Sequence, residues 1–180
     1  MTRGTTKTLR VGGIFLVVIF LLCAFISLPQ PVQATNTVTA TVTVGSEPEN
    51  VAVTPNGAYA YVANYLNDSV SVISTGTNTV TATVAVGSHP GDVAITPNGA
   101  YVYVTNFIGS SVSVINTATN TATTTITVGT YPEGVAITPN GAYAYIANGG
   151  NGSVSVINTA KYSNSDDNRW SLSFRCGYNA

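Results

Sequence analysis

The stretch Val51-Ala-Val-Thr-Pro-Asn-Gly-Ala-Tyr-Ala-Tyr-Val-Ala-Asn64 decides the fold of this chain, because it returns twice at a fixed spacing. Its copies are Val93–Asn106 and Val135–Asn148, so the repeat is 42 residues long. Three copies in register begin at Asn36, Asn78 and Asn120, and they agree in all three at 23 of the 42 columns. A period near 40 residues, rich in short β-type runs, is typical of the blades of a β-propeller.

Each copy predicts four short strands. Thr37–Val44 alternates Thr with Val or Ala, which is the period of a strand with one apolar face. Val51–Thr54 and Ala58–Asn64 flank a Pro-Asn-Gly turn, whose proline presets φ and whose Asn and Gly tolerate the positive φ of a tight hairpin. Ser69–Ser74 is the next predicted strand, and Thr79–Val86 completes a four-stranded antiparallel blade.

The predicted fold class is all-β: a partial β-propeller of about three four-stranded antiparallel blades, built from the 42-residue repeats. Propellers usually need about 4–8 blades to close a ring, so we expect an open arc. Thr37–Val44 should open the array, and the third blade should lack its outer strand. The apolar end faces and free strand edges of such an arc predict self-association.

The three copies share a short motif that resembles a known repeat family. Tyr103-Val-Thr-Asn106 is the YVTN signature itself, and Tyr61–Asn64 and Tyr145–Asn148 are its variants. With Thr-Pro-Asn-Gly upstream and Ser-Val-Ser-Val-Ile downstream, the chain resembles the YVTN-family β-propeller repeat, typified by archaeal surface-layer proteins and also found in bacterial cell-surface proteins. The resemblance implies a seven-bladed propeller where enough repeats are present, and it implies no catalytic residues.

Charge and cysteine content exclude two classes of protein. Between Arg10 and Lys161 the chain has no Lys or Arg, whereas it has five acidic residues there. A nucleic-acid binder needs cationic side chains against the phosphates, so nucleic acid is excluded as a partner. Cys23 and Cys176 both lie outside the repeats, which argues against a disulfide framework.

Residues 1–34 are interpreted as a signal peptide, followed by repeats over residues 35–160. Arg3, Lys7 and Arg10 form a basic segment, Val11–Leu28 is an unbroken apolar stretch, and Val32-Gln-Ala34 offers a small-residue cleavage site. Retention as an N-terminal membrane anchor is the alternative, since the apolar stretch is long for a signal peptide. Either way we expect the repeats to be secreted or at the cell surface.

The sequence changes character after the repeats. Residues 161–180 bring in Lys, Arg, Trp and Cys, which are rare or absent before them. Back-translated and read one base later, this tail can spell NTVTATTIAGAYPSGVAITP, which closely matches the start of a repeat. We interpret residues 161–180 as an irregular tail, encoded by a fourth repeat read out of frame.

Variation between the copies is concentrated in two loops, one before Val51 and one after Asn64, which antiparallel strands should place on one face. Loops on a rigid scaffold commonly carry binding residues, so a cell-surface protein or glycan is the predicted partner there. Neutral drift in exposed loops is the alternative explanation. The candidate interaction residues are Glu47, Glu49, Tyr65, Leu66, His89, Asp92, Phe107, Ile108, Tyr131 and Glu133.

No catalytic, metal or cofactor site is predicted. His89 is the only histidine, and no Ser, Cys or carboxylate constellation accompanies it in the sequence. The acidic loop residues lack the spacing of a calcium-binding loop. Asn67 and Asn151 begin N-glycosylation sequons in equivalent loops and are predicted sites of that modification.

The sequence therefore favours a non-enzymatic extracellular protein of the surface-layer or adhesin type, presenting variable loops. One alternative is a truncated product of a larger propeller protein. The other is an enzyme similar to propeller lactonases or quinone-dependent dehydrogenases. We disfavour the enzyme because the strands expected to line the channel (Val51–Thr54, Val93–Thr96 and Val135–Thr138) offer only Val, Ala, Ile and Thr.

Overall fold

The computed structural model describes residues 36–162. The chain divides into two compact units, Met1–Thr39 and Ala40–Ala180, and all strands lie in the second. The predicted signal peptide and nearly all of the predicted out-of-frame tail lie outside the described residues. The strands are β1 (Pro48–Val53), β2 (Tyr59–Asn64), β3 (Ser69–Ser74), β4 (Thr79–Ala85), β5 (Pro90–Ile95), β6 (Tyr101–Asn106), β7 (Ser111–Asn116), β8 (Thr121–Thr127), β9 (Pro132–Ile137), β10 (Tyr143–Asn148) and β11 (Ser153–Asn158).

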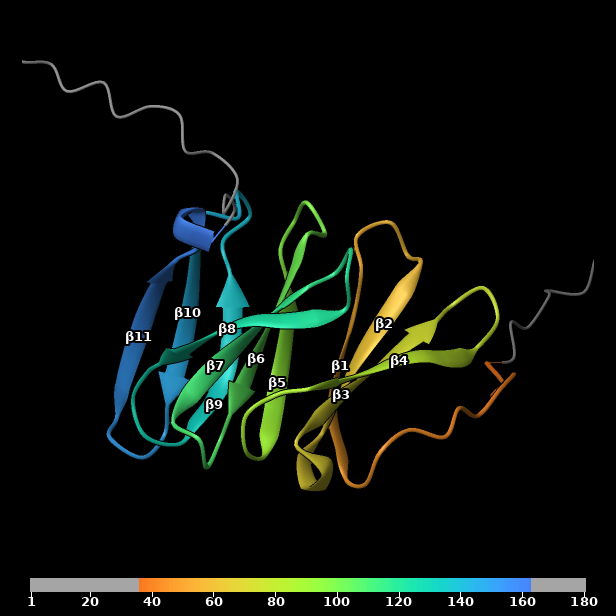
Figure 1. Cartoon of the computed structure of the whole chain (residues 1–180), viewed down its shortest axis with the longest axis horizontal. Helices are drawn as coiled ribbons and strands as arrows, with labels where there is room; N and C mark the ends of the chain where they lie inside the picture. Colours follow the sequence, from red (N-terminus) through yellow and green to blue (C-terminus); the bar gives the residue numbers. More distant parts are fainter. Residues whose placement is uncertain (1–35, 163–180) are drawn as a thin grey trace, which may run out of the picture. The chain divides into compact units, whose positions relative to one another are not determined.

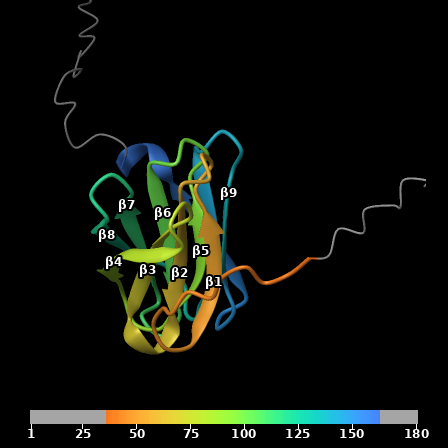
Figure 2. The same ribbon diagram turned by 90° about the vertical axis from the view of Figure 1, so that its right-hand side faces the viewer.

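These strands form three antiparallel sheets, which confirms the predicted partial β-propeller. Blade 1 is β1-β2-β3-β4, blade 2 is β5-β6-β7-β8, and blade 3 is the three-stranded sheet β9-β10-β11 (Figure 1). The described residues also contain two short 3₁₀ turns, at Tyr65–Asn67 and Thr159–Tyr162. The first strands β1, β5 and β9 lie along one side of the stack, and the fourth strands β4 and β8 lie along the other (Figure 2).

The prediction of a strand over Thr37–Val44 is wrong. These residues form no strand, whereas the equivalent segments of the next two repeats are β4 and β8. The reason is pairing. β4 pairs with β3 and β8 pairs with β7, each within its own blade, and residues 37–44 have no such neighbouring strand in the part of the chain that the structure describes. An alternating β-branched sequence forms a strand only where its backbone groups find a partner.

The Thr-Pro-Asn-Gly turns differ from the prediction in the role of their asparagine. Only the glycine takes a positive φ, at 71° for Gly57. Asn56 acts through its side chain instead: its Oδ1 accepts hydrogen bonds from Thr54 Oγ1 at 2.7 Å and from the Ala58 amide at 3.0 Å. The same arrangement recurs in the other two blades, so this turn is a rigid connection between the first and second strands.

The apolar core lies between the blades. Tyr61, Val70 and Val72 of blade 1 pack with Val102 and Val104 of blade 2, and all five are at most 1% exposed. A second cluster joins blades 2 and 3 in the same way, through Tyr103, Val112, Val114, Ala144, Ile146 and Ile157. Burying one such valine stabilises the fold by about 1.5–3 kcal/mol, so the packed blade faces hold the stack together.

The asparagine at the end of each second strand contacts both the third strand and the glycine before the first strand. Asn64 Nδ2 donates to Ser69 Oγ at 3.2 Å and Ser71 Oγ at 2.9 Å, and the Gly45 amide donates to Asn64 Oδ1 at 3.1 Å. A Cβ on Gly45 would lie 2.5 Å from Asn64 Cγ, so no larger residue fits. The same close approach joins Gly87 to Asn106 and Gly129 to Asn148, which explains why the copies keep both residue types.

Candidate active site

The variable loops do share one face of the stack, as the strand order predicts. In each blade the loop after the second strand bonds back to the loop before the first. The backbone amides of Tyr65, Phe107 and Gly149 donate to the carbonyls of Glu47, His89 and Tyr131, at 2.9, 2.8 and 2.9 Å. These bonds hold the two loops of each blade side by side. Whether the loop residues bind a partner stays a prediction.

The first strands begin earlier than the sequence suggests, and this changes the chemistry of the face. β1, β5 and β9 start at Pro48, Pro90 and Pro132, three residues before the expected Val51, Val93 and Val135. An irregularity in each pairing lets the strand continue. The added residues include Glu49, Asp92 and Glu133, so the expectation that these strands offer only Val, Ala, Ile and Thr is wrong.

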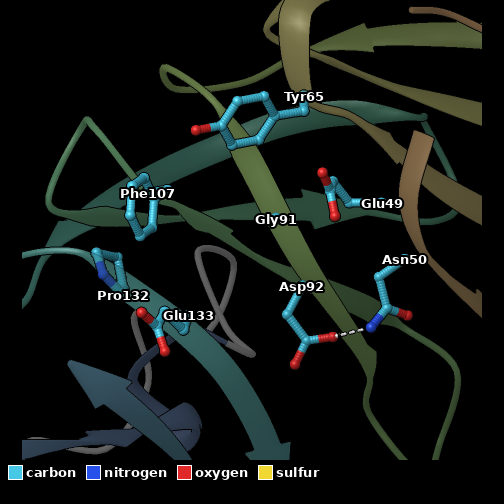
Figure 3. Close-up of a pocket in the computed structure, with 8 residues that line it drawn as sticks. All are labelled: Glu49, Asn50, Tyr65, Gly91, Asp92, Phe107, Pro132 and Glu133. Carbon is cyan, nitrogen blue, oxygen red and sulfur yellow. Dashed lines mark hydrogen bonds between the residues drawn. The ribbon is translucent and has the colours of Figure 1, made fainter. Parts of the chain in front are cut away.

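These acidic residues line a cleft at the starts of the first strands (Figure 3). Its volume is about 450 Å³, within the range of small-molecule sites. All three blades contribute to it, and the lining residues are Glu49, Asn50, Tyr65, Gly91, Asp92, Phe107, Pro132 and Glu133.

Asp92 ties the three blades together at the base of the cleft. Its Oδ1 accepts from Asn50 Nδ2 of blade 1 at 2.6 Å and from the amide of Val93 at 2.8 Å. Its Oδ2 accepts from the amide of Val135 in blade 3 at 2.8 Å. Since both oxygens are occupied, Asp92 positions the strands rather than reacting.

Glu49 and Glu133 lie on either side of Asp92 and are exposed. Within residues 36–162 neither carboxylate has a hydrogen bond or ion pair to another side chain. The Glu133 carboxylate lies over Gly149, where a Cβ would be 2.5 Å from its Oε1, so Gly149 leaves room for it. Two carboxylates without protein partners are available to a ligand or to a water molecule.

Aromatic side chains form a row along the rim of the cleft. Tyr65 meets His89 edge-on with ring centroids 4.7 Å apart, and Phe107 stacks on Tyr131 at 4.9 Å and 21°. Tyr65 and Phe107 are 6.4 Å apart, which connects the two pairs. The row offers exposed ring surface beside the two free carboxylates, although only Phe107 and Tyr131 lie nearly parallel.

The remaining candidate residues lie outside the cleft lining. His89 stays in its loop, where its Nδ1 is 2.8 Å from Ser88 Oγ and its amide donates to Asp68 Oδ1 at 2.8 Å. Leu66 and Ile108 are about half exposed, and Glu47 has a positive φ of 50°.

The two predicted glycosylation sites differ in their surroundings. Asn67 Oδ1 accepts from the Ser46 amide, and Asn151 Oδ1 accepts from Ser153 Oγ at 2.8 Å. Glycosylation of both stays a prediction.

Residues 36–162 contain no metal-binding cluster and no membrane-spanning helix. No group of three or more His, Cys, Asp or Glu side chains in this range could hold a metal ion. No helix in the same range is both long and apolar enough to cross a membrane. The absence of a metal or other cofactor from the functional protein stays a prediction.

Comparison with solved structures supports the propeller fold. Hydrazine synthase of Kuenenia stuttgartiensis aligns with a TM-score of 0.62 at 32% identity over 70% of this chain and 37% of its own. A putative 6-phosphogluconolactonase from Bacteroides fragilis NCTC 9343 aligns with a TM-score of 0.60 at 25% identity, over 66% and 36%. Another putative 6-phosphogluconolactonase, from Bacteroides uniformis ATCC 8492, has a TM-score of 0.59 at 21% identity, over 68% and 39%. The chain thus spans well under half the length of each.

Comparison of sequence families overturns the functional prediction. Residues 26–165 match the family model described as lactonase, 7-bladed beta-propeller, and none of the curated proteins matches significantly. The matches support a propeller repeat without showing a YVTN or surface-layer family. The prediction of a non-enzymatic surface protein is therefore wrong. It rested on the resemblance to the YVTN repeat family and on first strands that were predicted to begin after their acidic residues. On the family match, this chain belongs to the seven-bladed β-propeller lactonases.

Proposed function

We propose that this chain hydrolyses a lactone at the cleft between the starts of β1, β5 and β9. The observation that carries the proposal is the pair of free carboxylates, Glu49 and Glu133, beside an aromatic row in a chain that matches the lactonase family over residues 26–165. The cleft is also where first strands from separate blades converge, as a site at the axis of a propeller requires.

The chemistry follows from the groups present. One carboxylate accepts a proton from a water molecule, whose oxygen forms a bond to the carbonyl carbon of the lactone. The ring C–O bond then breaks, and the departing alkoxide takes up a proton to give the hydroxy acid. General-base catalysis of this kind contributes about 10²–10⁴-fold to the rate. Asp92 holds Asn50, β5 and β9 in place.

Charge indicates the kind of lactone. The names of two structural neighbours give a phosphorylated sugar lactone as substrate, and a phosphate group carries about two negative charges at neutral pH. The cleft holds three acidic residues, and residues 11–160 contain no Lys or Arg to neutralise a phosphate. An uncharged sugar lactone, stacked on Tyr65 or Phe107, fits this cleft better.

The test measures acid release by the full chain from glucono-δ-lactone and from its 6-phosphate, against spontaneous hydrolysis in buffer. We expect hydrolysis of the uncharged lactone, and we expect Glu49→Gln combined with Glu133→Gln to slow it about 100-fold or more. Glu47→Gln is the matched control, because Glu47 lies two residues before Glu49 but does not line the cleft. No rate above buffer, or full activity in the double variant, would refute the proposal.

We also propose that the repeats lie outside the cell and that their loop residues bind a cell-surface protein or glycan. Secretion, with the repeats outside the cell, is tested by adding protease to intact cells and following loss of the full-length chain. Binding of a cell-surface protein or glycan by the loop residues is tested with the same Glu49→Gln and Glu133→Gln substitutions.

A further inference from the structure

The two ends of the stack expose the complementary halves of the interface that joins the blades. On the blade 3 side, Tyr145, Val154 and Val156 are 44%, 61% and 55% exposed. Their equivalents Tyr61, Val70 and Val72 in blade 1 are at most 1% exposed, because blade 2 covers them. On the blade 1 side, Val51 is 57% exposed, whereas its equivalent Val93 is 6% exposed.

We propose that the end face of blade 3 docks on the end face of blade 1 in a second copy of this chain. The two end faces are equivalent to surfaces that pack against each other twice within the chain, between blades 1 and 2 and between blades 2 and 3. The docking therefore continues an existing interface and requires no new complementarity.

A hydrogen bond defines the rotation of one copy on the other. Tyr61 Oη donates to Asn120 Oδ1 of the next blade at 2.9 Å. The equivalent pair across the new interface is Tyr145 with Asn78 of the second copy. Asn78 takes the same positive φ as Asn120, 53° against 52°, so the acceptor is already in place.

The second copy also supplies the missing strand of blade 3. Gly45 packs on Asn64 as Gly87 packs on Asn106, and Gly87 lies just after β4. The residues before Gly45 therefore approach blade 1 as the outer strand of a preceding blade does. Among residues 36–162 they form no strand, while β11 pairs only with β10 and its other edge has no partner in this range.

The register of this strand follows from blade 1. There Val70 pairs with Val84, Ser71 with Thr83 and Val72 with Ala82. In blade 3 the residues equivalent to Val70, Ser71 and Val72 are Val154, Ser155 and Val156. One repeat before β4, the residues equivalent to Val84, Thr83 and Ala82 are Val42, Thr41 and Ala40. The same register therefore places Val154 opposite Val42, Ser155 opposite Thr41 and Val156 opposite Ala40 of the second copy. Two copies joined in this way supply six blades, one fewer than the seven of the matched family, whereas three copies would exceed seven. We therefore expect a head-to-tail dimer.

Disulfide trapping between full-length chains tests the register. One tagged chain carries Thr41→Cys and a differently tagged chain carries Ser155→Cys, with Cys23→Ser and Cys176→Ser in both. We expect a disulfide between the two tags under mild oxidation. Val42→Cys with Ser155→Cys is the control, because neighbouring residues of a strand point to opposite faces and this pair should stay reduced.

A surface charge tests the docking itself. Val154→Glu should reduce the trapped product at least tenfold, and Ile108→Glu, a similar change at a loop residue that is also more than half exposed, should leave it unchanged. A chain that sediments as a monomer and gives no disulfide, or equal trapping with Val42→Cys, would overturn the proposal.

Discussion

Blades 2 and 3 contain nearly the same sequence and have very different surroundings. Tyr103, Val112 and Val114 of blade 2 are fully buried, whereas Tyr145, Val154 and Val156 of blade 3 are about half exposed. The backbone pairing of the second and third strands is the same in both, residue for residue. The repeat sequence therefore determines how the strands pair within a blade. Whether the face with these three side chains is buried depends on the presence of the next blade.

The largest difference in stability is expected between Val114→Ala and Val156→Ala. Removing two methyl groups from the buried Val114 should lower the free energy of unfolding by about 1.5–3 kcal/mol. The same change at the exposed Val156 should cost less than about 0.5 kcal/mol when measured at a protein concentration too low for association. Urea unfolding followed by circular dichroism gives both values, and equal losses would contradict the comparison.

Glycine substitutions sharpen the comparison, because they probe a contact that does not need the next blade. Gly87→Ala and Gly129→Ala each bring a Cβ to 2.5 Å from an asparagine Cγ, in blades 2 and 3 respectively. Both should destabilise by a similar amount, about 1–3 kcal/mol. Gly76→Ala is the control, since nothing lies within 4 Å of its Cβ. A large difference between Gly87→Ala and Gly129→Ala would show that blade 3 is held differently.

Removal of a tyrosine hydroxyl gives a smaller effect. Tyr61→Phe loses the hydrogen bond to Asn120 and leaves that acceptor without its partner, which should cost about 1 kcal/mol. Tyr145→Phe should be neutral in an isolated chain, because no following blade accepts its hydroxyl. Thermal unfolding compares the stability of the two variants. A loss of stability in Tyr145→Phe alone would contradict the assignment of the hydrogen-bonded hydroxyl to Tyr61.

Alkaline pH gives the smallest expected effect. Burial, and then the neighbouring Tyr59, raise the pKa of Tyr61. A raised pKa in the folded state means that its contribution to stability is complete below the ordinary tyrosine pKa of about 10 and is lost as pH rises above it. Tyr61→Phe should therefore lose less stability than the wild type as pH rises above about 10. Identical pH profiles would contradict a role for Tyr61 in this loss.

Much of the fold could be predicted because short-range chemistry controls it. Ser69–Ser74 was expected as a strand with the bounds of β3, and the Pro-Asn-Gly turns join strands as predicted. Period-two alternation and turn residues depend only on a few neighbouring residues, so strands and turns can be predicted from the sequence of one repeat. The strand starts at Pro48 and Pro90, which bring in Glu49 and Asp92, were missed because bulged pairing with a second strand, and not local propensity, extends β1 and β5. A proline and an acidic residue gave no sign of a strand.

The sequence by itself determined the 42-residue repeat, the turns, the order of strands within a blade and the common face of the variable loops. Only the tertiary structure decided that residues 37–44 form no strand, that Tyr61 is buried while Tyr145 is exposed, and that Glu49, Asp92 and Glu133 converge on one cleft. The physical reason is that strand propensity and turn geometry depend on adjacent residues, whereas pairing, burial and the assembly of a site depend on which surfaces meet in space.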